Sequence, residues 1–311
     1  MTCEGKTSDV EAFFASAPSL RDEDTIRQRV QVFIDEHRSR HNRLVCVTSG
    51  GTTVPLERRC VRFIDNFSSG NRGAASTEYF LKADYAVIFL YRGGTIQPFC
   101  RSVPDDALLT CLEPDDSHGI KVRAEFYSDV EHAIRGNHEG LMSHKLLKVP
   151  YTTLFEYLQI LQIIATAAHS LQRLAMFYLA AAVSDFYVPW ESMGEHKIQS
   201  AGGSLAMQLA GVPKMISVLR EGWAPNAFCV SFKLETDQTI LIQKANDALR
   251  KYRVHAVVAN ELNTRRKKVT IVTANGDTVI ERTDQAPDVE MELVGFLCEK
   301  HAEFISNGQY T

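Results

Sequence analysis

The sequence predicts an α/β protein in which helices cover both faces of a mostly parallel sheet. Short apolar runs rich in β-branched residues alternate along the chain with segments whose apolar residues recur at helical spacing. This alternation is typical of parallel sheets, because a crossover helix separates each parallel strand from the next. The 311 residues are 45% hydrophobic and 23% charged, which is the composition of a globular protein with a large buried core.

The chain begins with a predicted N-terminal helical arm, residues 1–41. Within it, residues 24–37 carry apolar residues at helical spacing, which predicts an amphipathic helix. The next run, 44–48, is apolar and β-branched and stops at the small residues 49–52. A buried parallel strand that ends in a glycine turn has this pattern, so we expect the first strand of the sheet at 44–48.

Further strands and helices follow in alternation. The predicted strands are 85–91, 176–183, 227–232 and 254–259, and the predicted helices are 72–82, one that begins at 153, and 237–252. The helix that begins at 153 opens with Thr153 and Glu156, which have the spacing of a capping box. Strands that alternate with helices in this way build a sheet covered on both faces.

Two segments interrupt the alternation. Residues 93–150 are polar and mixed, and we expect an insertion of weak structure that decorates the sheet. Residues 267–281 predict a hairpin with a type I′ turn at Asn275-Gly276, which would add an antiparallel edge to the sheet or an arm to a partner subunit. The basic run 265–268 could be interpreted as a patch that binds nucleic acid. The favoured interpretation is that these charges are solvated and protect a sheet edge.

Charge and cysteine usage exclude several classes of protein. The formal charge is −4, with 34 Lys and Arg against 38 Asp and Glu, so no basic field attracts nucleic acid or an anionic membrane. The 7 scattered cysteines form no Cys-x-x-Cys pair, which favours the cytoplasm and argues against structural zinc. His37 and His41 are interpreted as a solvated, cationic helix end, so we expect no metal site there. No signal peptide or membrane span is expected.

Small polar residues end the predicted strands, at the edge where open parallel sheets bind ligands. They are Ser49, Gly50, Gly51, Thr52, Ser184, Asp185, Lys233 and Asn260. Residues 68–73 immediately precede a helix, so their backbone N–H groups predict a phosphate site at a positive helix N-terminus. Neither G-x-G-x-x-G nor a complete P-loop is present, and from spacing alone a structural turn and a nucleotide loop are equally good interpretations.

A long polar loop, residues 189–204, follows Asp185 and carries Lys197. From composition alone, the lysine is an exposed loop residue. The functional interpretation is a lid that closes on a phosphorylated substrate and brings Lys197 to a developing charge.

Five strings of the sequence together resemble one family. They are Val47-Thr-Ser-Gly-Gly-Thr52, Val61-Arg-Phe-Ile-Asp-Asn-Phe-Ser-Ser-Gly70, Phe177-Tyr-Leu-Ala-Ala-Ala-Val-Ser-Asp-Phe-Tyr-Val-Pro189, Glu195-His-Lys-Ile-Gln-Ser200 and Ser231-Phe-Lys-Leu-Glu-Thr-Asp237. In this order they are similar to the eukaryotic-type phosphopantothenoylcysteine synthetases (phosphopantothenate–cysteine ligases) of coenzyme A biosynthesis. The N-terminal arm and the 93–150 insertion lie outside the resemblance.

The resemblance implies a Rossmann-like, three-layer αβα homodimer. Its implied reaction uses ATP and Mg²⁺ to activate the carboxylate of 4′-phosphopantothenate as an acyl-adenylate, which L-cysteine then attacks. The ligase domain would span 42–305, with 189–204 as a flap and 267–281 as a hairpin or dimerisation element, followed by a tail at 306–311. The flavin-dependent decarboxylase domain fused in bacterial versions is not expected.

The resemblance also implies roles for single residues. Nucleotide-binding positions of the family match Gly50, Ser68, Gly70, Gly73, Phe232, Lys233 and Asn260. Positions that bind phosphopantothenate and the intermediate match Arg62, Asn66, Ala181, Ala182 and Asp185. Arg62 and Asn66 are expected to reach across the dimer, so that two subunits share a substrate site. Lys197 matches the flap lysine and is expected to be catalytic together with Asn66 and Asp185. Lys233 replaces a small residue of bacterial relatives, which favours ATP over CTP.

Two alternative functions stay open. A nicotinamide-dependent oxidoreductase would share the fold class, but it should carry an acidic residue at the end of the second strand, where this chain has Tyr91-Arg92. A catalytically inactive regulatory homologue is the other alternative. Release of pyrophosphate from ATP and phosphopantothenate would separate the ligase from both.

Overall fold

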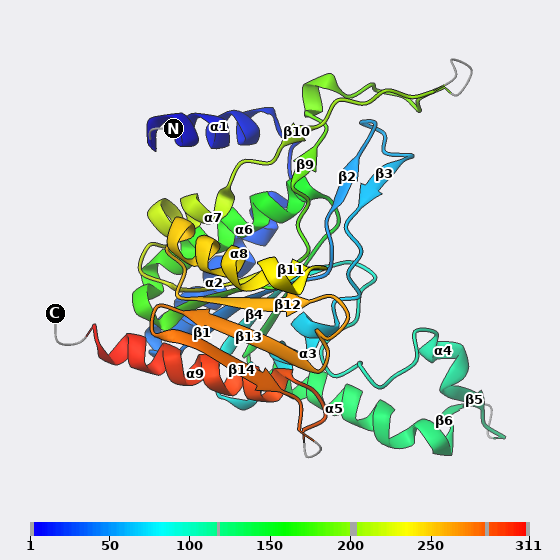
Figure 1. The fold of residues 1–311 in the computed structure, drawn as a ribbon. Coiled ribbons are helices and arrows are strands. Elements are labelled where there is room, and N and C mark those ends of the chain that lie inside the picture. The colour runs from blue at the N-terminus through cyan, green and yellow to red at the C-terminus, as the bar shows by residue number, and fades with distance from the viewer. Residues whose placement is uncertain (1–2, 117–118, 200–203, 284–285, 309–311) are drawn as a thin grey trace.

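An eight-stranded sheet forms the centre of the molecule (Figure 1). The computed structural model describes residues 3–116, 119–199, 204–283 and 286–308. The strands of this sheet are β1 (Leu44–Ser49), β4 (Ala86–Arg92), β7 (Leu146–Tyr151), β8 (Ala175–Leu179), β11 (Phe228–Glu235), β12 (Ala256–Glu261), β13 (Lys268–Thr273) and β14 (Gly276–Glu281). They lie in the order β14-β13-β12-β11-β8-β1-β4-β7. All neighbours from β12 to β7 pair in parallel, whereas β13 and β14 are antiparallel, so the predicted fold class is confirmed.

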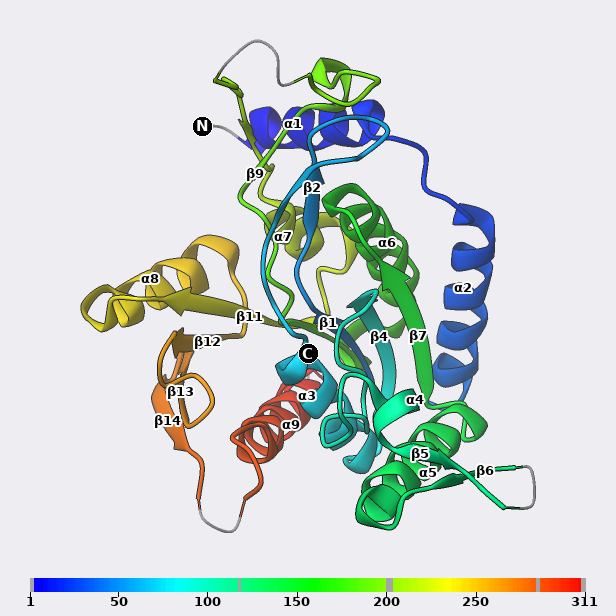
Figure 2. The same ribbon diagram turned by 90° about the vertical axis from the view of Figure 1, so that its right-hand side faces the viewer.

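Helices cover both faces of this sheet, as Figures 1 and 2 show. One face carries α2 (Glu23–Ser39), α6 (Leu154–Ala168) and α8 (Gln238–Tyr252), and the other carries α3 (Asn71–Lys82) and α9 (Glu290–Ser306). The remaining helices are α1 (Cys3–Ser16), α4 (Ala107–Thr110), α5 (Tyr127–Met142) and α7 (Met215–Val218). In the part of the chain that the structure describes, no helix is long and apolar enough to cross a membrane.

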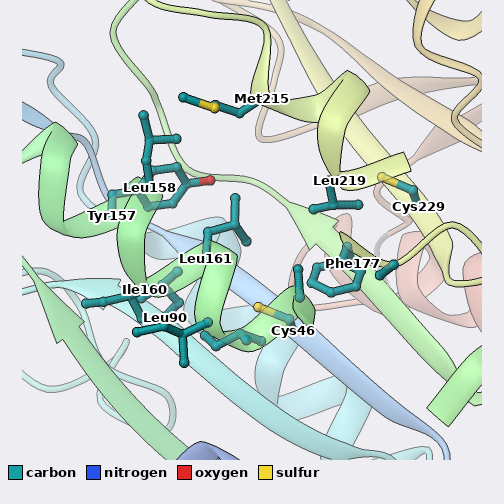
Figure 3. Packing of buried hydrophobic residues seen from close by; sticks show 14 of the residues in the cluster. Cys46, Leu90, Tyr157, Leu158, Ile160, Leu161, Phe177, Met215, Leu219 and Cys229 are labelled. Atoms are coloured by element: carbon teal, nitrogen blue, oxygen red, sulfur yellow. The ribbon is translucent and has the colours of Figure 1, made fainter. Parts of the chain in front are cut away.

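Two hydrophobic cores lie between the helices and the sheet. On the α6 side, Ile160 and Leu161 pack with Cys46, Leu90 and Phe177 of the strands (Figure 3). The predicted capping box fixes the start of α6. The hydroxyl of Thr153 accepts from the N–H of Glu156 at 3.2 Å, and the carboxylate of Glu156 accepts from the N–H of Thr153 at 2.9 Å. Such a cap stabilises a helix by about 1 kcal/mol.

The N-terminal segment is helical, as predicted, and its first helix, α1, packs against α6 and β9. The ring of Phe13 in α1 lies 5.4 Å from that of Phe155 and 5.1 Å from that of Tyr187. The prediction for His37 is wrong, because the side chain is fully buried at the end of α2. Its ring bonds to the carbonyl of His144 at 2.8 Å, and burial lowers its pKa.

The prediction of weak structure in residues 93–150 is wrong. The segment contains α5 and the edge strand β7, which pairs in parallel with β4. Pro150 obscured the strand pattern, because proline has no N–H to donate to a neighbouring strand. β7 lies at the edge of the sheet and pairs with β4 alone, so one of its sides needs no donor and proline fits there. Gly136 and Gly140 likewise weaken the helical pattern of α5. The short strands β5 (Leu112–Pro114) and β6 (Ile120–Val122) form a separate antiparallel pair.

Two further predictions needed correction at the level of single turns. The strand expected at 176–183 ends at Leu179, because the backbone then turns and Ala182 bonds with Gly50 and Thr52 in the loop after β1. The 267–281 hairpin is confirmed, but Thr273 pairs with Gly276, so its turn lies one residue earlier than predicted. The two connecting residues, Ala274 and Asn275, do not have the positive φ that a type I′ turn requires at both positions. The positive φ, +119°, is found at Gly276 instead, so the turn is not type I′.

Two small hairpins project beyond the carboxyl ends of the parallel strands. The first pairs β2 (Thr53–Pro55) with β3 (Phe63–Asp65), and we call residues 53–65 the arm. The second pairs β9 (Phe186–Tyr187) with β10 (Ala210–Gly211). The predicted flap, 189–204, lies between β9 and β10, and its residues 200–203 are outside the described part of the chain. Figure 1 shows the flap beside the arm.

Candidate active site

A cavity of about 740 Å³ opens at the carboxyl ends of β8, β11 and β12 and beside the loop after β1. β1 has β4 on one side and β8 on the other, so the order of the parallel strands reverses between β1 and β8. Open parallel sheets bind their ligands beside such a reversal. The cavity also has the size of a pocket for a small organic molecule.

One wall of the cavity is the N-terminus of α3. Ser68, Ser69, Asn71 and Arg72 line it. The residue before the helix is Gly70, at φ +80°, and no side chain caps the first turn. The first backbone N–H groups of a helix have no partner within the helix, so this wall keeps the arrangement on which the predicted phosphate site at residues 68–73 depends.

Cationic side chains dominate the charge around the cavity. The lining residues Arg72, Lys214, Lys233, Arg265 and Arg266 are basic, and Asp185 and Glu290 are acidic. Lys214 lies 3.4 Å from Asp185 at the exposed mouth of the cavity. A wall with this excess of positive charge attracts phosphorylated ligands.

Arg72 joins three elements at the inner end of the cavity. Its guanidinium donates to the carbonyl of Arg265 at 2.6 Å and lies 3.0 Å from the carboxylate of Glu290. Burial raises the pKa of Glu290, and the charge of Arg72 partly offsets that rise. The Arg72 guanidinium also lies 5.9 Å from the ring of Phe232, so charge and aromatic surface meet at one place.

Asn260 supplies an unused acceptor to the same end of the cavity. The residue is only 5% exposed, and its amide N–H donates to the carbonyl of Val258 at 3.0 Å. Among the described residues, the amide oxygen of Asn260 has no hydrogen-bond partner. A buried acceptor of this kind is stabilised when a ligand donates to it.

Backbone hydrogen bonds fix the loop that follows β8. The N–H of Ala181 donates to the hydroxyl of Thr48 at 3.0 Å, and the N–H of Ala182 donates to the carbonyl of Gly50 at 2.8 Å. The N–H of Asn66 donates to the carbonyl of Thr52 at 3.1 Å. These contacts hold the loops after β1 and β8 side by side on the cavity wall.

The structure brings most of the predicted site residues together and leaves others outside the cavity. Those that line it are Asn66, Ser68, Ala181, Ala182, Asp185, Phe232, Lys233 and Asn260. Those that do not are Gly50, Arg62, Gly70, Gly73 and Lys197. Gly73 packs behind the cavity, where an added Cβ would lie 2.4 Å from the hydroxyl oxygen of Ser49. Lys197 is exposed on the flap.

Several cavity residues were not predicted from the sequence. An apolar wall is formed by Tyr157, Leu158, Leu161, Met215 and Leu219, which also belong to the hydrophobic core. The basic run 265–268 was interpreted as solvated edge charges, and this is wrong for Arg265 and Arg266, which line the cavity. Lys267 and Lys268 are exposed and do not line the cavity, so they fit that interpretation, and Lys268 pairs with Glu281 at 2.9 Å. The position of the run just after β12 was the signal for the correct assignment.

Comparisons with known proteins agree on one family. The profile of the DNA/pantothenate metabolism flavoprotein C-terminal domain matches residues 152–294. Phosphopantothenate–cysteine ligase 2 of Oryza sativa subsp. japonica is 55% identical over 302 residues, which cover 96% of this chain and 94% of the relative. The human phosphopantothenate–cysteine ligase is 46% identical, with 85% and 88% covered. A solved Cab2 mutant in complex with phosphopantothenate-cysteine superimposes with a TM-score of 0.90 at 36% identity, with 96% and 99% covered.

Proposed function

The chain belongs to the phosphopantothenate–cysteine ligases, and we propose that its cavity joins 4′-phosphopantothenate to L-cysteine with ATP, through an acyl-adenylate. The observation that carries this proposal is the combination, in one cavity, of an uncapped helix N-terminus, an excess of basic side chains and the unpaired oxygen of Asn260. Two phosphorylated substrates need such a site, because each brings negative charge that the wall must offset.

The proposed reaction has two steps. A carboxylate oxygen of phosphopantothenate attacks the α-phosphorus of ATP, an O–P bond forms, and pyrophosphate leaves. The amine of cysteine then attacks the acyl carbon, a C–N bond forms, AMP leaves, and the amine proton passes to solvent. The protein mainly holds the two anions in reacting positions and stabilises the charge that develops at phosphorus and then at the acyl oxygen.

We assign the end of the cavity near Arg72, Phe232 and Asn260 to the nucleotide. The basic Lys233 lines this part, 3.3 Å from Glu235, and its replacement of a small bacterial residue favours ATP over CTP. Among the described residues, no group of three His, Cys, Asp or Glu side chains could hold a metal ion. Mg²⁺ would therefore bind mainly through the phosphate oxygens of ATP, as it does in many nucleotide sites.

The complete site would be shared between two copies of the chain. Arg62 and Lys197 lie outside the cavity of their own chain, although both have expected roles in the reaction. The arm also exposes apolar side chains, with Val61 54%, Phe63 52% and Ile64 39% exposed. Apolar surface of this kind favours association, and a second copy would cover it while bringing its arm and flap to the cavity.

A pyrophosphate-release assay tests the proposed function. The purified chain is mixed with phosphopantothenate, Mg²⁺ and either ATP or CTP, with and without L-cysteine. We expect release with ATP in both cases, and the amide product only with cysteine. Faster turnover with CTP would contradict the nucleotide assignment. The absence of release with either nucleotide would contradict the ligase function.

Cytoplasmic location remains a prediction. The free thiols of Cys46 and Cys229 are buried in neighbouring parts of the sheet core, which agrees with a reducing compartment. Cell fractionation followed by immunoblotting of the chain would test it.

A further inference from the structure

Glu57 is a fully buried carboxylate at the junction between the arm and the flap, with 0% of its surface exposed. One carboxylate oxygen accepts from the N–H groups of Val61 at 3.2 Å and Arg62 at 2.9 Å. The other accepts from the guanidinium of Arg62 at 3.0 Å and from the N–H of Ile198 at 3.2 Å. Burial alone would raise the pKa of Glu57, but these hydrogen bonds outweigh it and lower the pKa, so the carboxylate is ionised at neutral pH.

The backbone of the flap also follows the arm on either side of Glu57. The N–H of Arg58 donates to the carbonyl of Gly194 at 2.9 Å, and the N–H of Arg59 donates to the carbonyl of Glu195 at 3.3 Å. The guanidinium of Arg62 donates to the carbonyl of Ile198 at 2.9 Å. The described part of the flap is therefore attached to the arm along several residues.

We propose that Glu57 is a positioning residue of the ligation reaction. One of its carboxylate oxygens binds both Ile198 and Arg62, and this shared contact holds the flap lysine, Lys197, in register with Arg62. This inference rests on the proposed role of Lys197. The hydrogen bond to Ile198 is the contact of Glu57 nearest in sequence to that lysine. A charge-assisted contact of this kind is about twice as strong as a neutral one, and it fixes the backbone from which the lysine side chain extends.

Glu57→Gln tests the positioning role with little change in shape. Gln retains one acceptor oxygen, but it loses the negative charge and offers an N–H where Ile198 or Arg62 also donates. Because a displacement of about 1 Å can cost a factor of about 100 in rate, we expect kcat to fall about 10- to 100-fold while the KM for ATP changes little.

Glu195→Gln is the matched control. Glu195 lies on the same boundary between flap and arm, where it pairs with Arg59 at 2.9 Å, but its side chain is 50% exposed. Exposed ion pairs contribute about 0 to 1 kcal/mol, so we expect turnover within about twofold of wild type.

A double-mutant comparison separates positioning from a general structural role. If Glu57 acts through the lysine, Glu57→Gln should lower kcat in the wild-type background and cause no further loss in a Lys197→Ala background. A second variant, Ile198→Pro, removes the N–H donor of the flap and leaves Glu57 and the contacts inside the arm in place. It should lower kcat in the same way, and it decides the question if Glu57→Gln does not fold.

Limited trypsin digestion gives a readout that does not depend on activity. Cleavage after Lys197, followed by mass spectrometry, should be faster in Glu57→Gln than in wild type or Glu195→Gln. The inference is overturned if folded Glu57→Gln keeps wild-type kcat, if its loss persists in the Lys197→Ala background, if Ile198→Pro turns over normally, or if cleavage is unchanged. A wild-type chain without ligase activity would contradict the proposed function, and the digestion would still test the contact.

Discussion

The side chain of Lys197 is exposed on the flap and does not line the cavity of its own chain. We predict that Lys197→Gln folds and associates normally but lowers kcat by about two to three orders of magnitude, which is the usual cost of removing one preorganised donor from a developing charge. Normal folding is expected because an exposed flap residue supports no core. Thermal melting and steady-state kinetics at saturating substrates measure the two effects.

Gln199→Ala is the control for this prediction. Gln199 is exposed two residues away and offers a phosphate no charge. Its amide donates to the carbonyl of Lys197 at 3.0 Å, but an exposed bond between neutral groups contributes little, so turnover should change little. If Lys197→Gln retained wild-type turnover, the lysine would be a solvated loop residue and the flap would at most exclude water.

Asn66 differs from Lys197 because it does line the cavity, and its backbone is fixed to Thr52. Its side-chain amide can donate to the carbonyl of an acyl-adenylate and accept from the incoming amine. Asn66→Asp keeps the size, removes the donor and adds repulsion against a phosphorylated intermediate. We therefore predict that amide formation falls at least about tenfold more than pyrophosphate release, the cost expected for a lost hydrogen bond near a charge. Equal losses in both half-reactions, measured separately, would count against this role.

Some cavity residues were predicted from short strings of the sequence and others were not. The two groups differ in how the fold brings them to the cavity. Asn66, Ala181 and Asn260 stand at the ends of strands or in the loops that follow, where a short string determines both identity and position. Arg72 and Glu290 meet only because α3 and α9 pack on the same face of the sheet, with more than 200 residues between them in sequence. No local pattern records such a contact, since it depends on tertiary packing.

Elements were predicted best where one local signal was strong. β1, α3 and the start of α6 were expected within a few residues of their observed positions, and for α6 the apolar periodicity and the capping box agree. β7 and α5 were missed because their sequences contain Pro150, Gly136 and Gly140, which local propensity penalises. Packing against β4 outweighs that penalty in the folded chain.

The packing of α9 against the sheet predicts a dependence of stability on pH. His301 is fully buried, and its ring bonds to the hydroxyl of Tyr85 and to the carbonyl of Arg173, each at 2.9 Å. Burial lowers the pKa of His301 to about 4. Burial and nearby positive charge, Arg220 first, lower that of His255 to about 3. Both rings are therefore neutral in the folded protein at pH 5.

The sign of the effect follows from proton binding. Below about pH 6.5 the unfolded chain takes up protons on these histidines before the folded chain does, so the free energy of unfolding falls with falling pH. We predict that their contribution is complete above about pH 6.5 and is lost progressively between about pH 6.5 and pH 3. Urea unfolding at pH 7.5, 6 and 5 measures it. His255→Gln should give a shallower dependence, and an unchanged slope in that variant would contradict the assignment.

At the scale of the whole molecule, the exposed apolar arm predicts self-association. Phe63 in β3 is 52% exposed and does not line the cavity, so Phe63→Asp should weaken dimerisation without changing the site within one chain. We predict a dissociation constant at least about 100-fold higher, because a carboxylate buried in an apolar interface costs several kcal/mol. Sedimentation velocity over a range of concentrations measures it.

Leu108→Asp is the matched control for that experiment. Leu108 is 70% exposed in α4, within the segment 93–150, where no shared site is expected. Its dimerisation should equal that of wild type. A monomeric wild type, or equal effects of the two substitutions, would show that the arm is not the interface.

The attachment of the flap to the arm has a consequence for mixtures of variants. If Lys197 serves the neighbouring cavity while Asn260 serves its own, Lys197→Ala and Asn260→Ala subunits are each inactive alone, yet a hybrid pair contains one cavity with both residues intact. After random subunit exchange, half of the pairs would be hybrids, and the mixture should recover about a quarter of wild-type activity. Complementation between two inactive alleles would then be possible in a living cell.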